Sequence, residues 1–177
     1  MNPWHDVEPK NGDDLNVIVE VPKLSRVKYE LDKKTGLIKV DRVLYSPMHY
    51  PADYGFVPKT LWDDGDPLDV LVLSAEGYVP GCLVEVRPIG ALEMNDGGDD
   101  DLKVLAVPSK DPRVKNTRDI KDLEPHILDE IKHFFKVYKD LQNKEVKVGE
   151  WLGKEEAWKA VEKSIEAYQK SGHAKRP

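Results

Sequence analysis

The feature that most constrains the fold is a series of short apolar strands, bounded by glycine and proline, that gives way to two amphipathic helices. The strand patterns cover residues 16–21, 26–31, 37–44, 70–73, 83–92 and 102–107. Strands that precede helices in this way predict a mostly β domain of the α+β class. Pro88 and Gly90 interrupt the longest strand, so we expect a strongly curved sheet or a small closed barrel.

The last third of the chain predicts the two helices. The first covers residues 125–141, starts with a proline and places an apolar side chain every three or four residues. The second covers residues 154–170 and is expected to stop at Gly172, before a polar tail. We predict an irregular lead-in over residues 1–15 and an ordered loop, rather than a central strand, over the proline-rich residues 46–58.

Size and composition indicate one globular domain. The chain has 177 residues, of which 40% are hydrophobic and 34% are charged. No apolar run approaches the roughly 20 residues of a membrane span, and the first residues lack the order of a signal peptide, so the cytoplasm is the expected location. Cys82 is the one cysteine, which excludes an internal disulfide and is expected to be a small core residue.

The net charge of −6 at pH 7 narrows the partners. Nucleic acids and anionic membranes select clustered basic residues, so neither is an expected partner of this chain. A small anionic substrate is still compatible with an acidic protein, because divalent cations bridge two sets of negative charge.

Two acidic turns each run directly into an apolar strand. Residues 62–69 hold four aspartates around a glycine and a proline, and residues 95–101 form the second turn. Asp64, Asp66 and Asp69 are expected to lie roughly 4 to 8 Å apart, where their charges repel unless cations or protons intervene. Two interpretations stay open here: a metal site shared by both turns, or turns whose carboxylates cap backbone amides and face water.

The chemistry of these side chains narrows the choice of metal. Ligands that are all oxygen select hard cations, Mg²⁺ or Mn²⁺ rather than Zn²⁺. A helix-loop-helix calcium site is a poor match, because Pro67 interrupts its loop pattern and strands flank the turn. The sequence also lacks the phosphate-binding motifs G-x-x-x-x-G-K-[ST] and G-x-G-x-x-G, and the nucleophile motif G-x-S-x-G.

Basic and phenolic residues supply candidate anion-binding groups. Lys28 and Glu30 lie side by side on one strand, and the return strand brings Arg42 near Lys28. Further candidates are Tyr50, Tyr54, Tyr138 and Lys139. Taken alone, the charged residues are expected to form solvated ion pairs, and the tyrosines are expected to be packed rings. Beside hard cations, the same groups suit a substrate that carries phosphate.

The segment Asp64-Gly65-Asp66-Pro67-Leu68-Asp69 resembles the D-x-D-P-x-D signature of the family I soluble inorganic pyrophosphatases, in their short prokaryotic form. The resemblance covers nearly the whole chain and includes Glu20-Val21-Pro22, Lys28-Tyr29-Glu30, Asp41-Arg42, Tyr50-Pro51, Tyr54-Gly55, Asp101-Leu102-Lys103, His133-Phe134-Phe135 and Tyr138-Lys139. It implies one pyrophosphatase domain over residues 1–177, with a five-stranded closed β-barrel of the oligonucleotide-binding type and two C-terminal α-helices packed on it. The implied activity is Mg²⁺-dependent hydrolysis of inorganic pyrophosphate to two orthophosphates by a metal-activated water.

The resemblance also implies a role for each matched residue. Asp66 would accept a proton from the metal-bound water. The metal ligands would be Asp64, Asp69, Asp101, Asp96 and Glu30, with Asp69 bridging two ions. Pyrophosphate would be bound by Lys28, Arg42, Tyr54, Lys103, Tyr138 and Lys139, with Glu20 in support. About three to four Mg²⁺ ions per site are expected, with Mn²⁺ as a substitute; Gly97 stands where the family commonly has an acidic residue, so the outer metal sites are expected to differ.

The family further implies a homohexamer that binds pyrophosphate as its magnesium complex, with His133 and Asp140 at subunit contacts. A competing function is a non-catalytic, divalent-cation-dependent nucleotide-binding barrel, although the strands lack the interleaved aromatic and basic residues of such modules. Another is a broad phosphomonoesterase. Release of phosphate from pyrophosphate but not from p-nitrophenyl phosphate, with Mg²⁺ and without it, separates the three.

Overall fold

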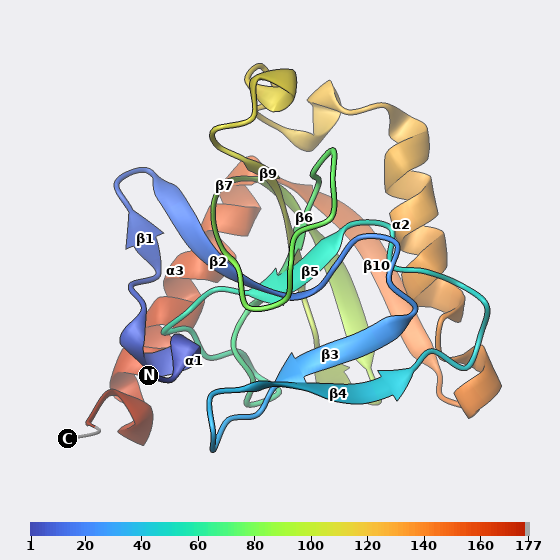
Figure 1. Ribbon diagram of the computed structural model, residues 1–177. Coiled ribbons are helices and arrows are strands. Elements are labelled where there is room, and N and C mark those ends of the chain that lie inside the picture. The colour runs from blue at the N-terminus through green and yellow to red at the C-terminus, as the bar shows by residue number, and fades with distance from the viewer. Residues whose placement is uncertain (176–177) are drawn as a thin grey trace.

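The computed structural model describes residues 1–175 (Figure 1). Its strands are β1 (Lys10–Asn11), β2 (Asp14–Val21), β3 (Val27–Leu31), β4 (Ile38–Val43), β5 (Asp53–Phe56), β6 (Asp69–Val72), β7 (Leu83–Asp96), β8 (Asp99–Asp100), β9 (Lys103–Pro108) and β10 (Val146–Gly153). Its α-helices are α1 (Pro3–Asp6), α2 (Pro125–Val137) and α3 (Lys154–Lys170), and its 3₁₀ turns are η1 (Pro112–Val114), η2 (Ile120–Asp122), η3 (Asp140–Gln142) and η4 (Gly172–Lys175). The predicted order, strands first and two long helices later, is confirmed.

Five strands close a barrel. β2 pairs with β5, β5 with β6, β6 with β9, β9 with β7, and β7 returns to β2. The β6–β9 pair is parallel, whereas the other pairs are antiparallel. The register of β7 against β9 shifts between Pro88 and Gly90, where the proline cannot donate to the ladder and the strand bends. The predicted closed barrel is therefore confirmed.

The β3–β4 hairpin forms a two-stranded sheet of its own, which lies below the barrel in the view of Figure 1. Its register places Lys28 opposite Arg42 and Glu30 opposite Lys39. The predicted proximity of Lys28 and Arg42 is confirmed, and the hairpin carries a dense set of charges beside the barrel.

Helices α2 and α3 cover different sides of the barrel (Figure 1). Ile131, Phe134 and Phe135 of α2 are buried in one apolar cluster with barrel side chains. Ala157 and Val161 of α3 are buried in a second cluster. Each helix buries most of the apolar stripe that its spacing predicts, whereas Leu141, at the predicted end of the first helix, is 61% exposed.

The prediction of a loop over residues 46–58 is wrong, because this stretch contains β5, a central barrel strand. Pro51 and Pro58 flank the strand and do not occupy a ladder position within it. Gly55 lies inside β5, where a Cβ atom would stand 2.0 Å from the carbonyl oxygen of Ile18 on β2. Glycine is required there for the two strands to approach.

Two further predictions, one for the lead-in over residues 1–15 and one for Cys82, are wrong. The lead-in is not irregular, since it contains α1 and β1: the Asn2 side chain caps α1 by accepting a hydrogen bond from the Trp4 amide (3.1 Å). Trp4 itself is buried. Cys82 is exposed and is not a core residue, because it lies in the turn before β7 rather than in the strand.

The helix bounds agree with the sequence pattern at α3 and differ at α2. α3 covers Lys154–Lys170, as predicted, but Ser171 ends it and Gly172 begins η4. The predicted polar tail runs beyond the described residues. α2 ends at Val137, and Asp140 begins the separate turn η3. None of the helices in residues 1–175 has both the length and the apolar character that crossing a membrane requires.

Candidate active site

The first acidic turn is held by its own backbone. The Trp62 amide donates to the carbonyl oxygen of Asp66 (2.7 Å), the Gly65 amide donates to the carbonyl oxygen of Trp62 (3.0 Å), and Gly65 has φ of +84°. Asp64 Oδ1 accepts a hydrogen bond from the Asp66 amide (2.9 Å), so the amide-capping interpretation holds for one of its oxygens. Asp63 pairs with Lys163 of α3 (2.9 Å) and does not line the pocket that Asp66 and Asp69 line.

The parallel pairing of β6 and β9 brings the two acidic turns together. It places Asp69 opposite Lys103, and Asp101 precedes the same strand. The ammonium of Lys103 ion-pairs with both Asp69 and Asp101. Lys103 is 3% exposed and Asp101 is 9% exposed, so this cluster of charges is buried in the barrel mouth.

Burial decides the electrostatics of this cluster. It raises the pKa of Asp101 to about 6; the charge of Lys103 opposes the rise and that of Asp69 adds to it. Burial alone would lower the pKa of Lys103, but Asp69 and Asp101 together hold it above its usual value. The ammonium of Lys103 therefore favours the charged form of Asp101, which burial disfavours.

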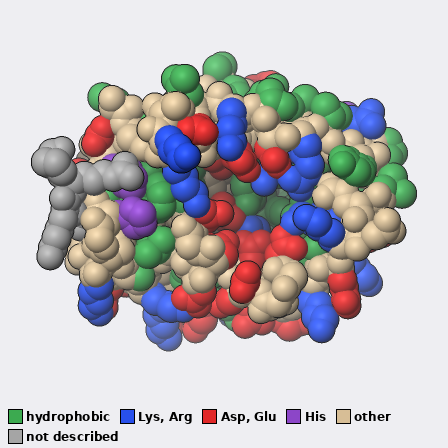
Figure 2. All heavy atoms as spheres, turned by 90° about the horizontal axis from the view of Figure 1, so that it is seen from below, with side chains coloured by type: hydrophobic (Ala, Val, Ile, Leu, Met, Phe, Trp, Pro, Cys, Tyr) green, Lys and Arg blue, Asp and Glu red, His purple; other side chains and the backbone are tan. Residues whose placement is uncertain are grey.

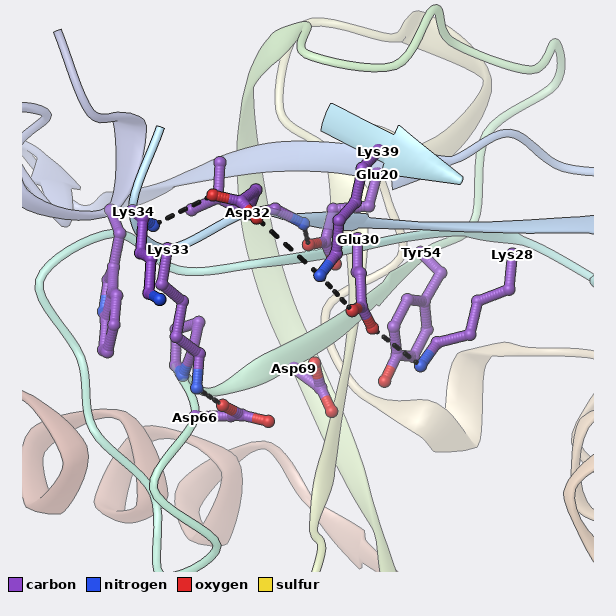
Figure 3. Close-up of a pocket in the computed structure, with 13 residues that line it drawn as sticks. Glu20, Lys28, Glu30, Asp32, Lys33, Lys34, Lys39, Tyr54, Asp66 and Asp69 are labelled. Carbon is purple, nitrogen blue, oxygen red and sulfur yellow. Dashed lines mark hydrogen bonds and ion pairs between the residues drawn. The ribbon is translucent and has the colours of Figure 1, made fainter. Parts of the chain in front are cut away.

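The hairpin contributes the outer wall of the site. Lys28 lies 3.5 Å from Glu30 and 3.5 Å from Asp41, and Lys39 lies 3.2 Å from Glu30. Arg42 pairs with Asp41. Figure 3 shows Lys39, Glu30 and Lys28 linked in a row, and these three side chains line the same pocket as Asp69, one of the predicted metal ligands.

Phenols and a lysine complete the wall on the barrel side. Lys103 Nζ lies 5.5 Å from the centre of the Tyr54 ring. Burial raises the pKa of both Tyr54 and Tyr138, so both stay protonated and are able to donate to an anion. Lys139 ion-pairs with Asp96, and burial lowers its pKa although Asp96 acts in the opposite direction.

Glu20 supports the site from behind. It is a buried residue of β2, and its Oε1 accepts a hydrogen bond from the Leu31 amide (2.7 Å), which ties the hairpin to the barrel. Burial and then the charge of Asp69 raise its pKa to about 8. The structure thus places Glu20 where β2 meets the hairpin, and its supporting role stays a prediction.

A pocket of about 480 Å³ is lined on the hairpin side by Lys28, Glu30 and Lys39, on the barrel side by Glu20, Tyr54 and Asp69, and at its edge by Asp66 and Trp4. Figure 2 shows a hollow in this face with acidic side chains gathered in it and basic side chains around it. Lys33, Lys39 and Trp4 line this pocket, and the sequence interpretation gave none of them a role. The charged run Asp32-Lys33-Lys34 at the hairpin turn was a local signal for Lys33 alone, and it did not indicate the contact with Asp66.

The donors fit a hard cation, although residues 1–175 contain no ready-made cage of three metal-binding side chains. The available donors are carboxylate oxygens, which suit Mg²⁺ or Mn²⁺. Most of these carboxylates form an ion pair with a lysine ammonium: Asp69 and Asp101 with Lys103, Asp96 with Lys139, and Glu30 with Lys28 and Lys39. Divalent cations would compete with these ammoniums for the same oxygens.

The fold and the site together define a class of protein: a β-barrel enzyme whose site brings aspartate and glutamate carboxylates together with lysine, arginine and tyrosine side chains. A family model described as inorganic pyrophosphatase matches residues 17–169. The chain therefore belongs to the inorganic pyrophosphatase family.

Similar proteins agree with this assignment. The chain is 53% identical over 169 residues to a soluble inorganic pyrophosphatase of Oryza sativa subsp. indica. The matched region covers 94% of this chain and 79% of the relative. A solved inorganic pyrophosphatase of Helicobacter pylori is 49% identical, with a TM-score of 0.89 over 93% of this chain and 99% of that one. One from Thermus thermophilus is 41% identical, with a TM-score of 0.90 over 94% and 99%. The family resemblance is confirmed.

Proposed function

We propose that this chain hydrolyses inorganic pyrophosphate, taken up as its magnesium complex, to two orthophosphates. The observation that carries the proposal is the buried group of Asp69, Lys103 and Asp101, which two neighbouring barrel strands bring together within reach of the hairpin cations. Similar proteins named soluble inorganic pyrophosphatase support the choice of substrate.

Asp64, Asp69 and Asp101 are the proposed ligands of the inner metal ions, with Asp69 between the two turns. Bound Mg²⁺ supplies acidified water and neutralises charge on phosphate oxygens. Asp96 and Glu30 lie on the outer side and are proposed for ions that arrive with the substrate. About three to four Mg²⁺ ions per site are proposed, with Mn²⁺ as the substitute.

Asp66 is the proposed general base. Its carboxylate is exposed at the pocket mouth, where it accepts the proton of the attacking water as the oxygen of that water adds to phosphorus. Lys28, Arg42 and Lys139 bind the phosphate oxygens. Lys103 pairs with Asp69 and Asp101, two of the proposed ligands of the inner metal ions. Tyr54 and Tyr138 donate to the same phosphate oxygens, which stabilises the charge that develops as the P–O bond breaks.

The test is release of orthophosphate from pyrophosphate with Mg²⁺ and with EDTA, beside p-nitrophenyl phosphate. We expect Mg²⁺-dependent release from pyrophosphate alone. Release from both compounds would favour the phosphomonoesterase, and release from neither would favour the nucleotide-binding barrel.

Replacement of the base gives the sharper assay. Asp66→Asn should lower turnover by about 10² to 10⁴-fold while Mg²⁺ still binds. Asp63→Asn is the matched control, because Asp63 belongs to the same turn but pairs with Lys163, and it should keep near-normal turnover. Wild-type turnover in Asp66→Asn would reject the base assignment.

We also propose the cytoplasm as the location and a homohexamer as the assembly, with His133 and Asp140 at subunit contacts. Both residues are exposed, although Asp140 lies in η3 and not on the same helix as His133. Gly97, with φ of +66°, carries no carboxylate for the outer ions. A monomeric sedimentation profile at micromolar concentration would reject the hexamer.

A further inference from the structure

Lys33 reaches from the hairpin turn to the proposed general base. It follows β3, yet its ammonium ion-pairs with Oδ1 of Asp66 and lies 3.4 Å from the carbonyl oxygen of Gly65. Figure 3 shows the Lys33 side chain extended across the pocket mouth to Asp66. The hairpin and the acidic turn therefore meet at this pair.

Contacts from the amino-terminal segment fix Lys33 independently of Asp66. Asn2 Nδ2 donates to the Lys33 carbonyl oxygen (3.0 Å), and Lys33 Nζ lies 5.5 Å from the centre of the Trp4 indole ring. An ammonium at this distance from an aromatic face is attracted to it. Trp4 is 2% exposed, and its Nε1 donates to the Thr60 carbonyl oxygen (2.8 Å). The indole is thus a fixed wall beside the lysine.

Asp66 itself is fixed by its backbone more than by its side chain. Its amide donates to Asp64 Oδ1 (2.9 Å), and its carbonyl oxygen accepts from the Trp62 amide (2.7 Å). Its carboxylate is oriented by Lys33, which contacts one oxygen and leaves the other on the side that faces Asp69 (Figure 3). A general base needs one oxygen aimed at the water from which it takes a proton.

We propose that Lys33 is a positioning residue for pyrophosphate hydrolysis, an inference that rests on the proposed function. Lys33 holds Oδ1 of Asp66 so that Oδ2 is presented to the attacking water, and Trp4 holds Lys33 in place. The side chains of Lys33 and Asp66 are 50% and 52% exposed, so their pairing adds little to folding stability. Orientation of a reacting group acts on the rate instead.

The first test is Lys33→Met, which removes the charge and keeps most of the side-chain length. We expect kcat for magnesium pyrophosphate to fall by about 10- to 100-fold, while KM stays within about threefold and the unfolding midpoint is unchanged. Lys33→Arg should recover most of kcat. Lys163→Met is the matched control: Lys163 also pairs with an aspartate of the acidic turn, Asp63, and is 54% exposed, but it does not line the pocket, so its loss should change kcat by less than about twofold.

A double-variant cycle with Asp66→Asn shows whether Lys33 acts through Asp66. We expect Lys33→Met to lower kcat by less than about threefold further once Asp66 is Asn. The proposal is overturned by equal losses in both backgrounds, by a raised KM at unchanged kcat, or by an equal loss in Lys163→Met. Wild-type protein that releases no phosphate from pyrophosphate would reject the proposed function instead, so the two failures are distinguishable.

Discussion

Replacement of Glu20 by Gln tests the electrostatics of the site most directly. The Glu20 carboxyl is 7% exposed, and burial followed by the charge of Asp69 raises its pKa from an ordinary 4.5 to about 8. Gln keeps the size of the side chain and a carbonyl oxygen that accepts from the Leu31 amide, as Glu20 does at 2.7 Å. The variant therefore removes the ionisation and little else.

The sign and size of the effect follow from this pKa. A carboxyl whose pKa is raised in the folded state keeps a proton that the unfolded chain releases, so stability is lost as pH rises. Below pH 4.5 the contribution is fully present, and it is lost between pH 4.5 and about 8. At about 1.4 kcal/mol per pKa unit, the loss at higher pH reaches about 5 kcal/mol. This value is an upper limit, because Glu20 borders a pocket that admits water.

The assay is urea unfolding of wild type and Glu20→Gln in EDTA, at one protein concentration, from about pH 5 to pH 9. EDTA removes divalent cations that would change the pKa of Glu20, and the difference between the two proteins cancels groups that titrate in both, such as Asp101. We expect a small difference at the acidic end and a variant more stable by up to about 5 kcal/mol at the basic end. A difference that does not change with pH refutes the reasoning.

Further variants probe charge and packing. Lys103→Met leaves Asp69 and Asp101 without their buried partner, so the free energy of unfolding in EDTA should fall by about 3–5 kcal/mol; Mg²⁺ should restore part of it in thermal unfolding, and an equal loss with Mg²⁺ would contradict the metal assignment. Gly55→Ala places a Cβ 2.0 Å from a carbonyl oxygen of β2 and should cost about 3 kcal/mol or more. Gly12→Ala, which meets nothing within 4 Å, should cost only about 1 kcal/mol for its positive φ; similar urea midpoints for these two variants would refute the packing argument.

Local patterns predicted the elements whose structure depends on neighbours in sequence. The 3.6-residue spacing gave the bounds of α3, Lys154–Lys170, because one face of that helix packs on the barrel along its whole length. The same approach failed at β5, where proline content suggested a loop. A glycine is needed at position 55 because the carbonyl oxygen of Ile18, on β2, lies against β5. This contact forms only when the barrel closes, so the sequence of the segment alone does not indicate it.

The candidate site, like the fold, was predictable from local sequence only in part. The two acidic turns, the charges of the hairpin and Lys139 were identified from the sequence pattern, and the family resemblance added Lys103 and Glu20. The sequence pattern gave no sign of Lys33 beside Asp66, or of Trp4 beneath Lys33, because these contacts join segments more than 25 positions apart. Such contacts are fixed by the closure of the barrel and the placement of the hairpin beside it.

The pairing of lysines with carboxylates explains how an acidic protein is able to bind an anion. Each lysine at an inner or outer carboxylate, as in Lys103 with Asp69 or Lys139 with Asp96, neutralises a charge that burial makes costly. On the proposed function, a magnesium pyrophosphate complex brings cations to those oxygens and phosphate oxygens to those ammoniums in the same step. Binding then exchanges one set of ion pairs for another and leaves neither sign unpaired, which neither free Mg²⁺ nor free pyrophosphate accomplishes alone.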